Sequence, residues 1–102
     1  MSYRALAALL AILVVGRVAA PAPADAQGGG QLARQWCANC HVVDAKSARA
    51  VPQGPPGFPT IAHGLTADQL RAFQSHPHGA MPDLSLSRSE MDDLIGYIET
   101  LR

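Results

Sequence analysis

The sequence predicts a small all-α domain of about three helices joined by long loops. Two segments open with a capping box, a Ser or Thr followed three residues later by Glu or Gln, and apolar residues at helical spacing follow each box. Prolines and glycines gather between the predicted helices, and no segment shows the apolar–polar alternation of a strand. A chain of 102 residues has room for one such domain.

Residues 1–26 are predicted to be a secretory leader and residues 27–102 the folded domain. Arg4 supplies a positive start, Ala5–Val15 is an apolar run of 11 residues, and Ala24-Asp25-Ala26 fits the A-x-A pattern that precedes cleavage. A membrane span needs about 20 apolar residues, so the run is too short for one. The prediction is therefore a periplasmic protein, with membrane contact only if the leader stays uncleaved.

The charge balance of the predicted domain argues against nucleic acid as a partner. Residues 27–102 carry six Lys or Arg and seven Asp or Glu, without a basic patch or a charge run. A domain of this size buries little surface by itself and usually needs an additional source of stability, such as a disulfide, a metal or a cofactor.

The first predicted helix spans Gln31–Cys40, with Leu32 and Trp36 on one face. A long irregular stretch, Val42–His63, follows and contains four prolines. A loop of that length inside a compact domain usually wraps around something functional.

Two further helices are predicted after this stretch. Thr66 opens a capping box before Ala67–Ser75, in which Leu70 and Phe73 are expected to face inward. A second loop, 80–86, leads to a helix over Arg88–Leu101. That last helix has the clearest apolar stripe in the chain, made of Met91, Leu94, Ile95, Ile98 and Leu101.

The chemistry of the chain is concentrated in Cys37, Cys40 and His41, which include both of its cysteines. Two thiols three residues apart on a helix lie on one face and can bond to the two vinyl groups of one haem. The histidine that follows can present its imidazole to the iron, and C-x-x-C-H is read as a c-type haem attachment site. A covalently held, apolar haem would also supply the core that the side chains lack.

Three alternatives to haem remain open from the residues alone. A redox-active dithiol would be expected beside a βαβ unit, and the chain has no predicted strand. A zinc site could combine the cysteines with His41, His63, His76 or His78, but the spacing of the last pair is shorter than usual. A simple disulfide would leave the histidine and the long loops without a role.

The sequence resembles the class I monohaem cytochromes c, in particular the small exported bacterial ones. The resemblance covers residues 31–102 and rests on the segments WCANCH at 36–41, GPPGF at 54–58, MPDL at 81–84 and the C-terminal helix ending LIGYIETL. It implies a cytochrome c fold wrapped around one haem, which Cys37 and Cys40 would hold covalently. Gly96 and Tyr97 match the place where the first and last helices of the family cross.

The resemblance also implies the residues around the iron. His41 and Met81 would be its two axial ligands, and a soft thioether ligand favours iron(II) relative to a second histidine. Met91 lies on the inward stripe of a helix, where methionine is usually core packing; His76 and His78 are alternative ligands. The carbonyl of Pro56, or of its neighbour Pro55, would accept a hydrogen bond from the axial histidine. Phe58, with Ile61, would line the haem cavity.

With both axial positions filled, the expected function is one-electron transfer rather than enzyme catalysis. The protein would cycle between Fe(II) and Fe(III) and pass electrons from a dehydrogenase or reductase to an oxidase or reductase, docking transiently at the haem edge, most simply as a monomer. Two alternatives stay open: a cytochrome subunit or dedicated acceptor of a periplasmic dehydrogenase, and a haem sensor or peroxidase with an open iron site.

Overall fold

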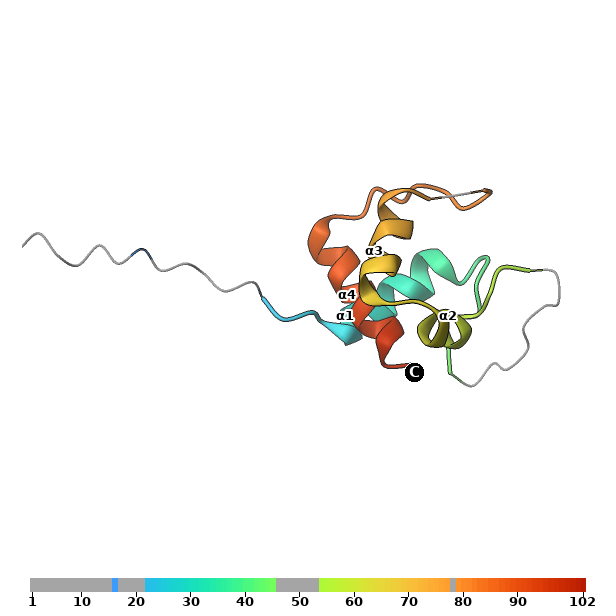
Figure 1. Ribbon diagram of the computed structural model, residues 1–102, viewed down its shortest axis with the longest axis horizontal. Coiled ribbons are helices and arrows are strands. Elements are labelled where there is room, and N and C mark those ends of the chain that lie inside the picture. The colour runs from blue at the N-terminus through green and yellow to red at the C-terminus, as the bar shows by residue number, and fades with distance from the viewer. Residues whose placement is uncertain (1–15, 17–21, 46–53, 78) are drawn as a thin grey trace, which may run out of the picture.

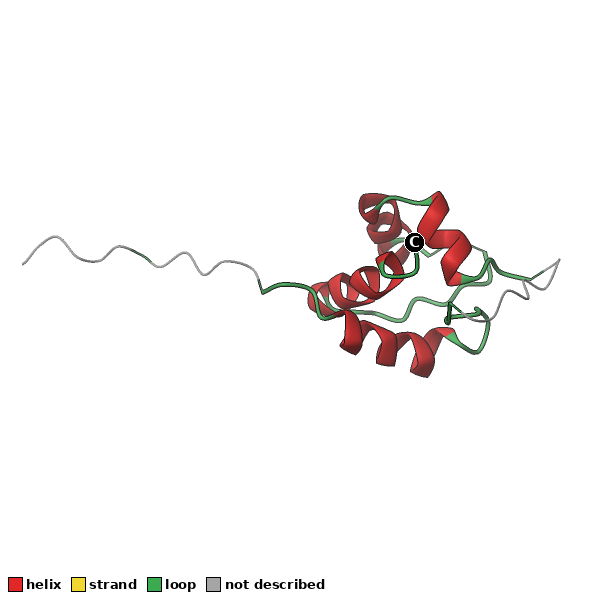
Figure 2. Cartoon of the chain, turned by 90° about the horizontal axis from the view of Figure 1, so that it is seen from below, coloured by secondary structure: helices red, strands yellow, loops and turns green. Residues whose placement is uncertain are grey.

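The computed structural model describes residue 16 and residues 22–45, 54–77 and 79–102. These parts fold into helices and loops, which confirms the all-α prediction (Figures 1 and 2). The elements are α1 (Ala26–Leu32), the single-turn π-helix η1 (Ala33–Cys37), α2 (Phe58–Gly64), α3 (Ala67–Ser75) and α4 (Arg88–Glu99). Within the described ranges, none of these helices has the length and apolar character that a membrane span requires.

The first helix differs from the predicted Gln31–Cys40 at both ends. It begins at Ala26, because the side chain of Asp25 caps it by accepting a hydrogen bond from Gly28 N, and α1 continues into η1 up to Cys37. Three successive glycines, residues 28–30, argue against a helix by propensity, and here tertiary contact overrides that preference. Asp25 and Ala26, which the sequence places in the leader, therefore take part in the folded domain; residues 1–15 and 17–21 lie outside the described residues.

Most of helix α2 (Phe58–Gly64) lies in the stretch Val42–His63 that was predicted to be irregular, so that prediction was wrong for residues 58–63. Pro59 occupies the first turn of the helix, where its missing N–H costs nothing because no partner exists there. The backbone N–H of Phe58 donates to Val42 O at 2.9 Å, which fixes the start of α2 against the segment after the cysteines. Residues 46–53 of the predicted loop lie outside the described residues.

Both predicted capping boxes are present. Thr66 and Gln69 exchange hydrogen bonds at the start of α3, and Ser87 and Glu90 do so at the start of α4. Helix α3 has its predicted bounds, whereas α4 ends at Glu99 and the chain closes in a turn at residues 100–101, short of the predicted Leu101.

Helices α1 and α4 cross in close contact (Figure 1). The closest approach is made by Gly29, where an added Cβ would lie only 1.9 Å from Asp93 O. The ring of Tyr97 covers Gly30, at 3.1 Å from the position of its would-be Cβ, whereas Gly96 faces Ala24 just before α1. The crossing thus lies near Tyr97, as the resemblance implied, but the glycine that permits it belongs to the first helix.

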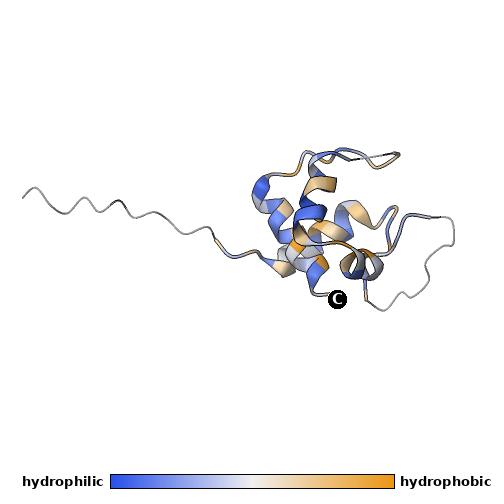
Figure 3. Ribbon diagram, in the orientation of Figure 1, coloured by the Kyte–Doolittle hydropathy of each residue, from blue (hydrophilic) through white to orange (hydrophobic). Residues whose placement is uncertain are grey.

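The core lies between these helices, and hydrophilic and hydrophobic residues alternate along α3 and α4 (Figure 3). Two aromatic side chains depart from expectation: Trp36 is 51% exposed and Phe73 is 40% exposed, although Phe73 was predicted to face inward. The buried members of the core are small or aliphatic apart from one aromatic ring; they are Ala33, Cys37, Val43, Phe58, Ala62, Leu70, Leu94, Ile95 and Ile98.

Candidate functional site

His41 is held in a fixed orientation directly after the cysteine pair. Its backbone N–H donates to Cys37 O at 2.8 Å, so the chain turns tightly at the end of η1. Its ring atom Nδ1 lies 2.8 Å from Pro56 O. Because a carbonyl oxygen can only accept, Nδ1 must carry the hydrogen, and in the neutral imidazole Nε2 then keeps its lone pair. This leaves His41 in the tautomer that can bind a metal through Nε2.

A row of aromatic rings supports the histidine. The ring centroids of His41 and Phe58 are 5.6 Å apart, and those of Phe58 and Tyr97 are 6.5 Å apart. Phe58 is buried, so its ring holds the imidazole from the side of the core. Pro56 lies just before α2 and Phe58 is its first residue, so the start of α2 positions the histidine.

Tyr97 ties α4 to the segment that follows the histidine. Its hydroxyl donates to Val43 O at 2.7 Å. Burial, and after it the nearby carboxylate of Asp44, raise the pKa of Tyr97 above its ordinary value, so the phenol retains the hydrogen that it donates.

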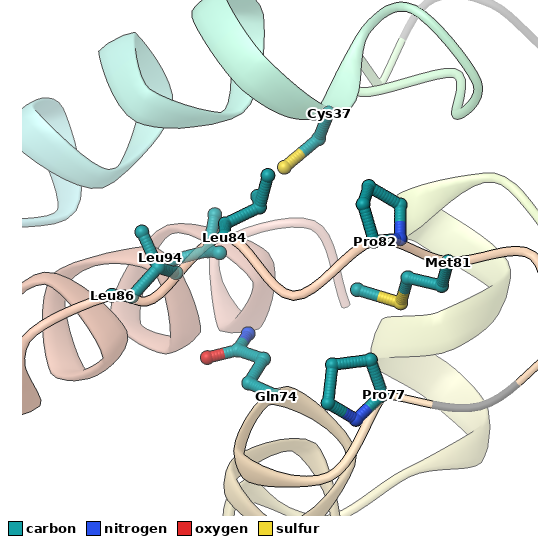
Figure 4. Close-up of a pocket in the computed structure, with 8 residues that line it drawn as sticks. All are labelled: Cys37, Gln74, Pro77, Met81, Pro82, Leu84, Leu86 and Leu94. Atoms are coloured by element: carbon teal, nitrogen blue, oxygen red, sulfur yellow. The ribbon is translucent and has the colours of Figure 1, made fainter.

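A cavity brings Cys37 and Met81 together, although they are 44 positions apart in the sequence (Figure 4). About 300 Å³ of empty space, including solvent at its open mouth, lies within it. In Figure 4 the thiol of Cys37 enters from the end of η1, and Met81 and Pro77 lie across the cavity from it. The lining residues are Cys37, Gln74, Pro77, Met81, Pro82, Leu84, Leu86 and Leu94.

Gln74 is the residue at this cavity that sequence reasoning missed. Its Oε1 atom is buried without a hydrogen-bond partner, in a cavity whose other lining residues are apolar or sulfur-bearing. A buried amide oxygen without a partner is costly, so it points to a site whose polar partner arrives with a bound group or water. Gln74 lies four residues after the buried Leu70 and therefore on the same face of α3. That spacing is the sequence feature that could have indicated that Gln74 faces inward.

The two cysteines are free thiols in different surroundings. Cys37 is buried and faces the cavity, whereas Cys40 is exposed. Burial raises the pKa of the Cys37 thiol above its usual value, so it stays protonated at neutral pH. In the described chain the pair is not joined as a disulfide.

The alternative ligands lie elsewhere. Met91 is not among the residues lining the cavity; its sulfur accepts from Ser75 Oγ at 3.8 Å between α3 and α4. His76 is the C-cap of α3 and His63 is exposed near the end of α2. His78 lies outside the described residues. Across the described ranges, no group of three or more His, Cys, Asp or Glu side chains could hold a metal ion.

The arrangement fits a haem c better than a bare metal ion. A thiol, a thioether and a buried amide without a partner line a mostly apolar cavity, and an imidazole with its Nε2 unbonded in the described chain lies outside the lining of that cavity. His41 itself does not line the cavity that Cys37 and Met81 share, so the structure shows two parts of the expected site, the histidine with Pro56 and Phe58, and the sulfur-lined cavity.

Comparison with known proteins agrees with this chemistry. A family model described as "Cytochrome C oxidase, cbb3-type, subunit III" matches residues 24–98. The chain is also 36% identical over 95 residues to "Cytochrome c-552" of Bradyrhizobium diazoefficiens, and this covers 91% of the chain and 90% of that protein. No solved structure matches the chain.

Proposed function

We propose that this chain, which belongs to the family of small monohaem c-type cytochromes, is an exported one-electron carrier of the periplasm. Cys37 and Cys40 would hold the haem by thioether bonds. His41 and Met81 would be the axial ligands of its iron. The haem supplies reversible one-electron chemistry when it is bound, and the protein supplies the ligands, the apolar surroundings and a surface for partners.

The observation that carries this proposal is the hydrogen bond between His41 Nδ1 and Pro56 O. Here the proton is held on Nδ1 by a backbone carbonyl, which orients the ring and leaves Nε2 as the ligand atom. The same bond makes the imidazole more electron-rich, which supports it as a ligand in both oxidation states.

Met81 supports a carrier rather than an enzyme. It lies on the segment between α3 and α4, half-buried, with its side chain at the cavity that Cys37 also lines. Pro77 and Pro82 flank the cavity and stiffen the backbone that delivers the sulfur. If His41 and Met81 both bound the iron of a haem, they would leave it no position for a substrate.

The surface around Met81 suggests how partners dock. Ala80 and Pro82 are exposed beside it, and the whole chain has a formal net charge of zero. Weak electrostatic steering and a small apolar rim favour brief encounters with electron donors and acceptors. We propose that the protein acts as a monomer in these encounters.

Optical spectra of the haem-loaded protein in both oxidation states test the ligand assignment. We expect a covalent haem whose ferric form shows the far-red band of sulfur-to-iron charge transfer. Met81→Ala should abolish this band, whereas Met91→Ala, the matched control at the α3–α4 contact, should keep it. Loss of the band in Met91→Ala alone would reverse the assignment, and a protein that takes up no haem would refute the proposed function.

A second candidate is a subunit or dedicated acceptor of a larger redox complex, such as a periplasmic dehydrogenase. The family description, which names an oxidase subunit, favours testing it. Elution of the native protein at its monomer size, apart from any larger redox enzyme, would support the carrier. A sensor or peroxidase would instead bind carbon monoxide readily in the reduced native protein, which Met81 ligation should prevent.

A further inference from the structure

Two overlapping motifs could direct removal of the leader. Ala24-Asp25-Ala26 would direct cleavage after Ala26, and Ala22-Pro23-Ala24 would direct cleavage after Ala24, since each motif has alanine at both positions that the A-x-A pattern requires. The sequence pattern does not choose between them. The two outcomes differ by Asp25 and Ala26, and the structure gives Asp25 a definite place in the fold.

Asp25 makes three hydrogen bonds to the folded domain. Its side chain accepts from Gly28 N at 3.1 Å, its carbonyl oxygen accepts from Gly29 N at 2.9 Å, and its own N–H donates to Asp93 Oδ1 on α4 at 2.7 Å. The first two satisfy amides at the start of the helix over residues 26–37, and the third joins that start to α4. Cleavage after Ala26 would remove all three bonds.

The neighbourhood of Asp25 is also shaped to receive it. A Cβ added to Gly28 would lie 2.7 Å from Asp25 Oδ2, so the carboxylate occupies the space that a side chain at position 28 would need. The described residues just before Asp25 contribute far less. Residues 22–24 are exposed and lie outside any helix, and the contact shown for them is that of the Ala24 methyl with Gly96.

We propose that the leader is removed between Ala24 and Asp25, so that Asp25 is the first residue of the mature protein. This inference rests on the proposed export. A leader peptidase would hydrolyse the Ala24–Asp25 amide: water gives its oxygen to the carboxylate of Ala24, and the released nitrogen of Asp25 becomes an ammonium group. That nitrogen is the atom 2.7 Å from Asp93 Oδ1. Cleavage thus turns a hydrogen bond from an uncharged amide to the Asp93 carboxylate into an ion pair between an ammonium group and that carboxylate.

N-terminal sequencing and intact mass of the haem-loaded protein, purified from the periplasm of an exporting host, give the first test. A chain that begins at Asp25 supports the proposal. A shortened chain that begins at Gln27, or at any residue other than Asp25, overturns the proposed cleavage site while leaving export intact. A protein that keeps Met1 and stays out of the periplasm refutes export itself, which separates failure of the proposed function from failure of the cleavage site.

Stability provides the second test. The haem-loaded chain that begins at Gln27 should unfold about 4–8 °C below the chain that begins at Asp25, because it lacks the cap. At about pH 6, where an α-amino group is protonated, Asp93→Asn should lower the unfolding temperature of the Asp25 chain more than that of a chain extended by residues 22–24. Equal effects of Asp93→Asn in the two chains would overturn the proposed ion pair.

Discussion

Replacing Gly29 by alanine should push apart helices α1 and α4, which cross at this position. The added Cβ would lie 1.9 Å from Asp93 O, 2.4 Å from Asp93 C and 2.9 Å from Leu94 N. To restore a separation of 3.0 Å, α1 and α4 must move apart by 1.1 Å or more, and both sides of the contact are backbone that cannot rotate away.

The size of this effect follows from two opposing contributions. Overpacking costs about 1–3 kcal/mol, and a clash with rigid backbone belongs at the upper end of that range. Alanine returns about 1 kcal/mol of helix propensity relative to glycine. The net loss in the free energy of unfolding is therefore about 2 kcal/mol, or a fall of about 8–16 °C in the unfolding temperature of a domain this small.

Denaturant unfolding of the haem-loaded protein, followed by circular dichroism, measures this loss against a matched control. Gly64→Ala makes the same chemical change at the exposed end of α2, where an added Cβ would meet nothing within 4 Å. It should leave stability unchanged or raise it by a few tenths of a kcal/mol. If Gly29→Ala proved as stable as the original while Gly64→Ala behaved as expected, the close contact of α1 and α4 would be refuted.

Three further substitutions test the supporting contacts. Tyr97→Phe removes the hydroxyl that donates to Val43 O and should cost about 1–2 kcal/mol in denaturant unfolding. The pKa of Tyr97 is raised in the folded state, so the protonated phenol stabilises the folded protein fully below pH 10, and this stabilisation is lost as pH rises above it. Tyr97→Phe should therefore also reduce the fall in stability at alkaline pH. Hydrogen bonds from Ser87 lower the pKa of Glu90, so the stability of the folded protein should fall as pH drops below 4.5. Glu90→Gln should reduce this acid dependence. Because Gln can form the same capping box, as Gln69 does at α3, the substitution should leave stability at neutral pH nearly unchanged. Thr66→Ala removes the other cap and should cost about 1 kcal/mol; no change in the unfolding midpoint would contradict the capping geometry.

Sequence patterns predict best those features that depend on residues lying close together along the chain. The pattern of Cys37, Cys40 and His41 required no knowledge of the fold, and the capping boxes gave the start of α3 and α4 correctly. The bond from His41 to Pro56 spans only 15 positions and was implied by the family resemblance.

Features that depend on distant contacts could not be predicted in the same way. The three glycines at 28–30 argue locally against a helix, and only the backbone of Asp93 explains why Gly29 is needed. Helix α2 was not predicted because the prolines around its start indicate a loop, although Pro59 also suits the first turn of a helix. Phe73 has the spacing of an inward residue, yet its exposure is set by how α3 lies on α4, which periodicity alone does not give.

The contact between Gly29 and Asp93 has a kinetic consequence. It joins positions 64 residues apart, so forming the contact between α1 and α4 requires closing a loop through nearly the whole domain. Domains dominated by such distant pairings fold more slowly than those built from local contacts. During synthesis, α1 and η1 are complete well before α4, so their contact with α4 can form only when the chain is nearly finished.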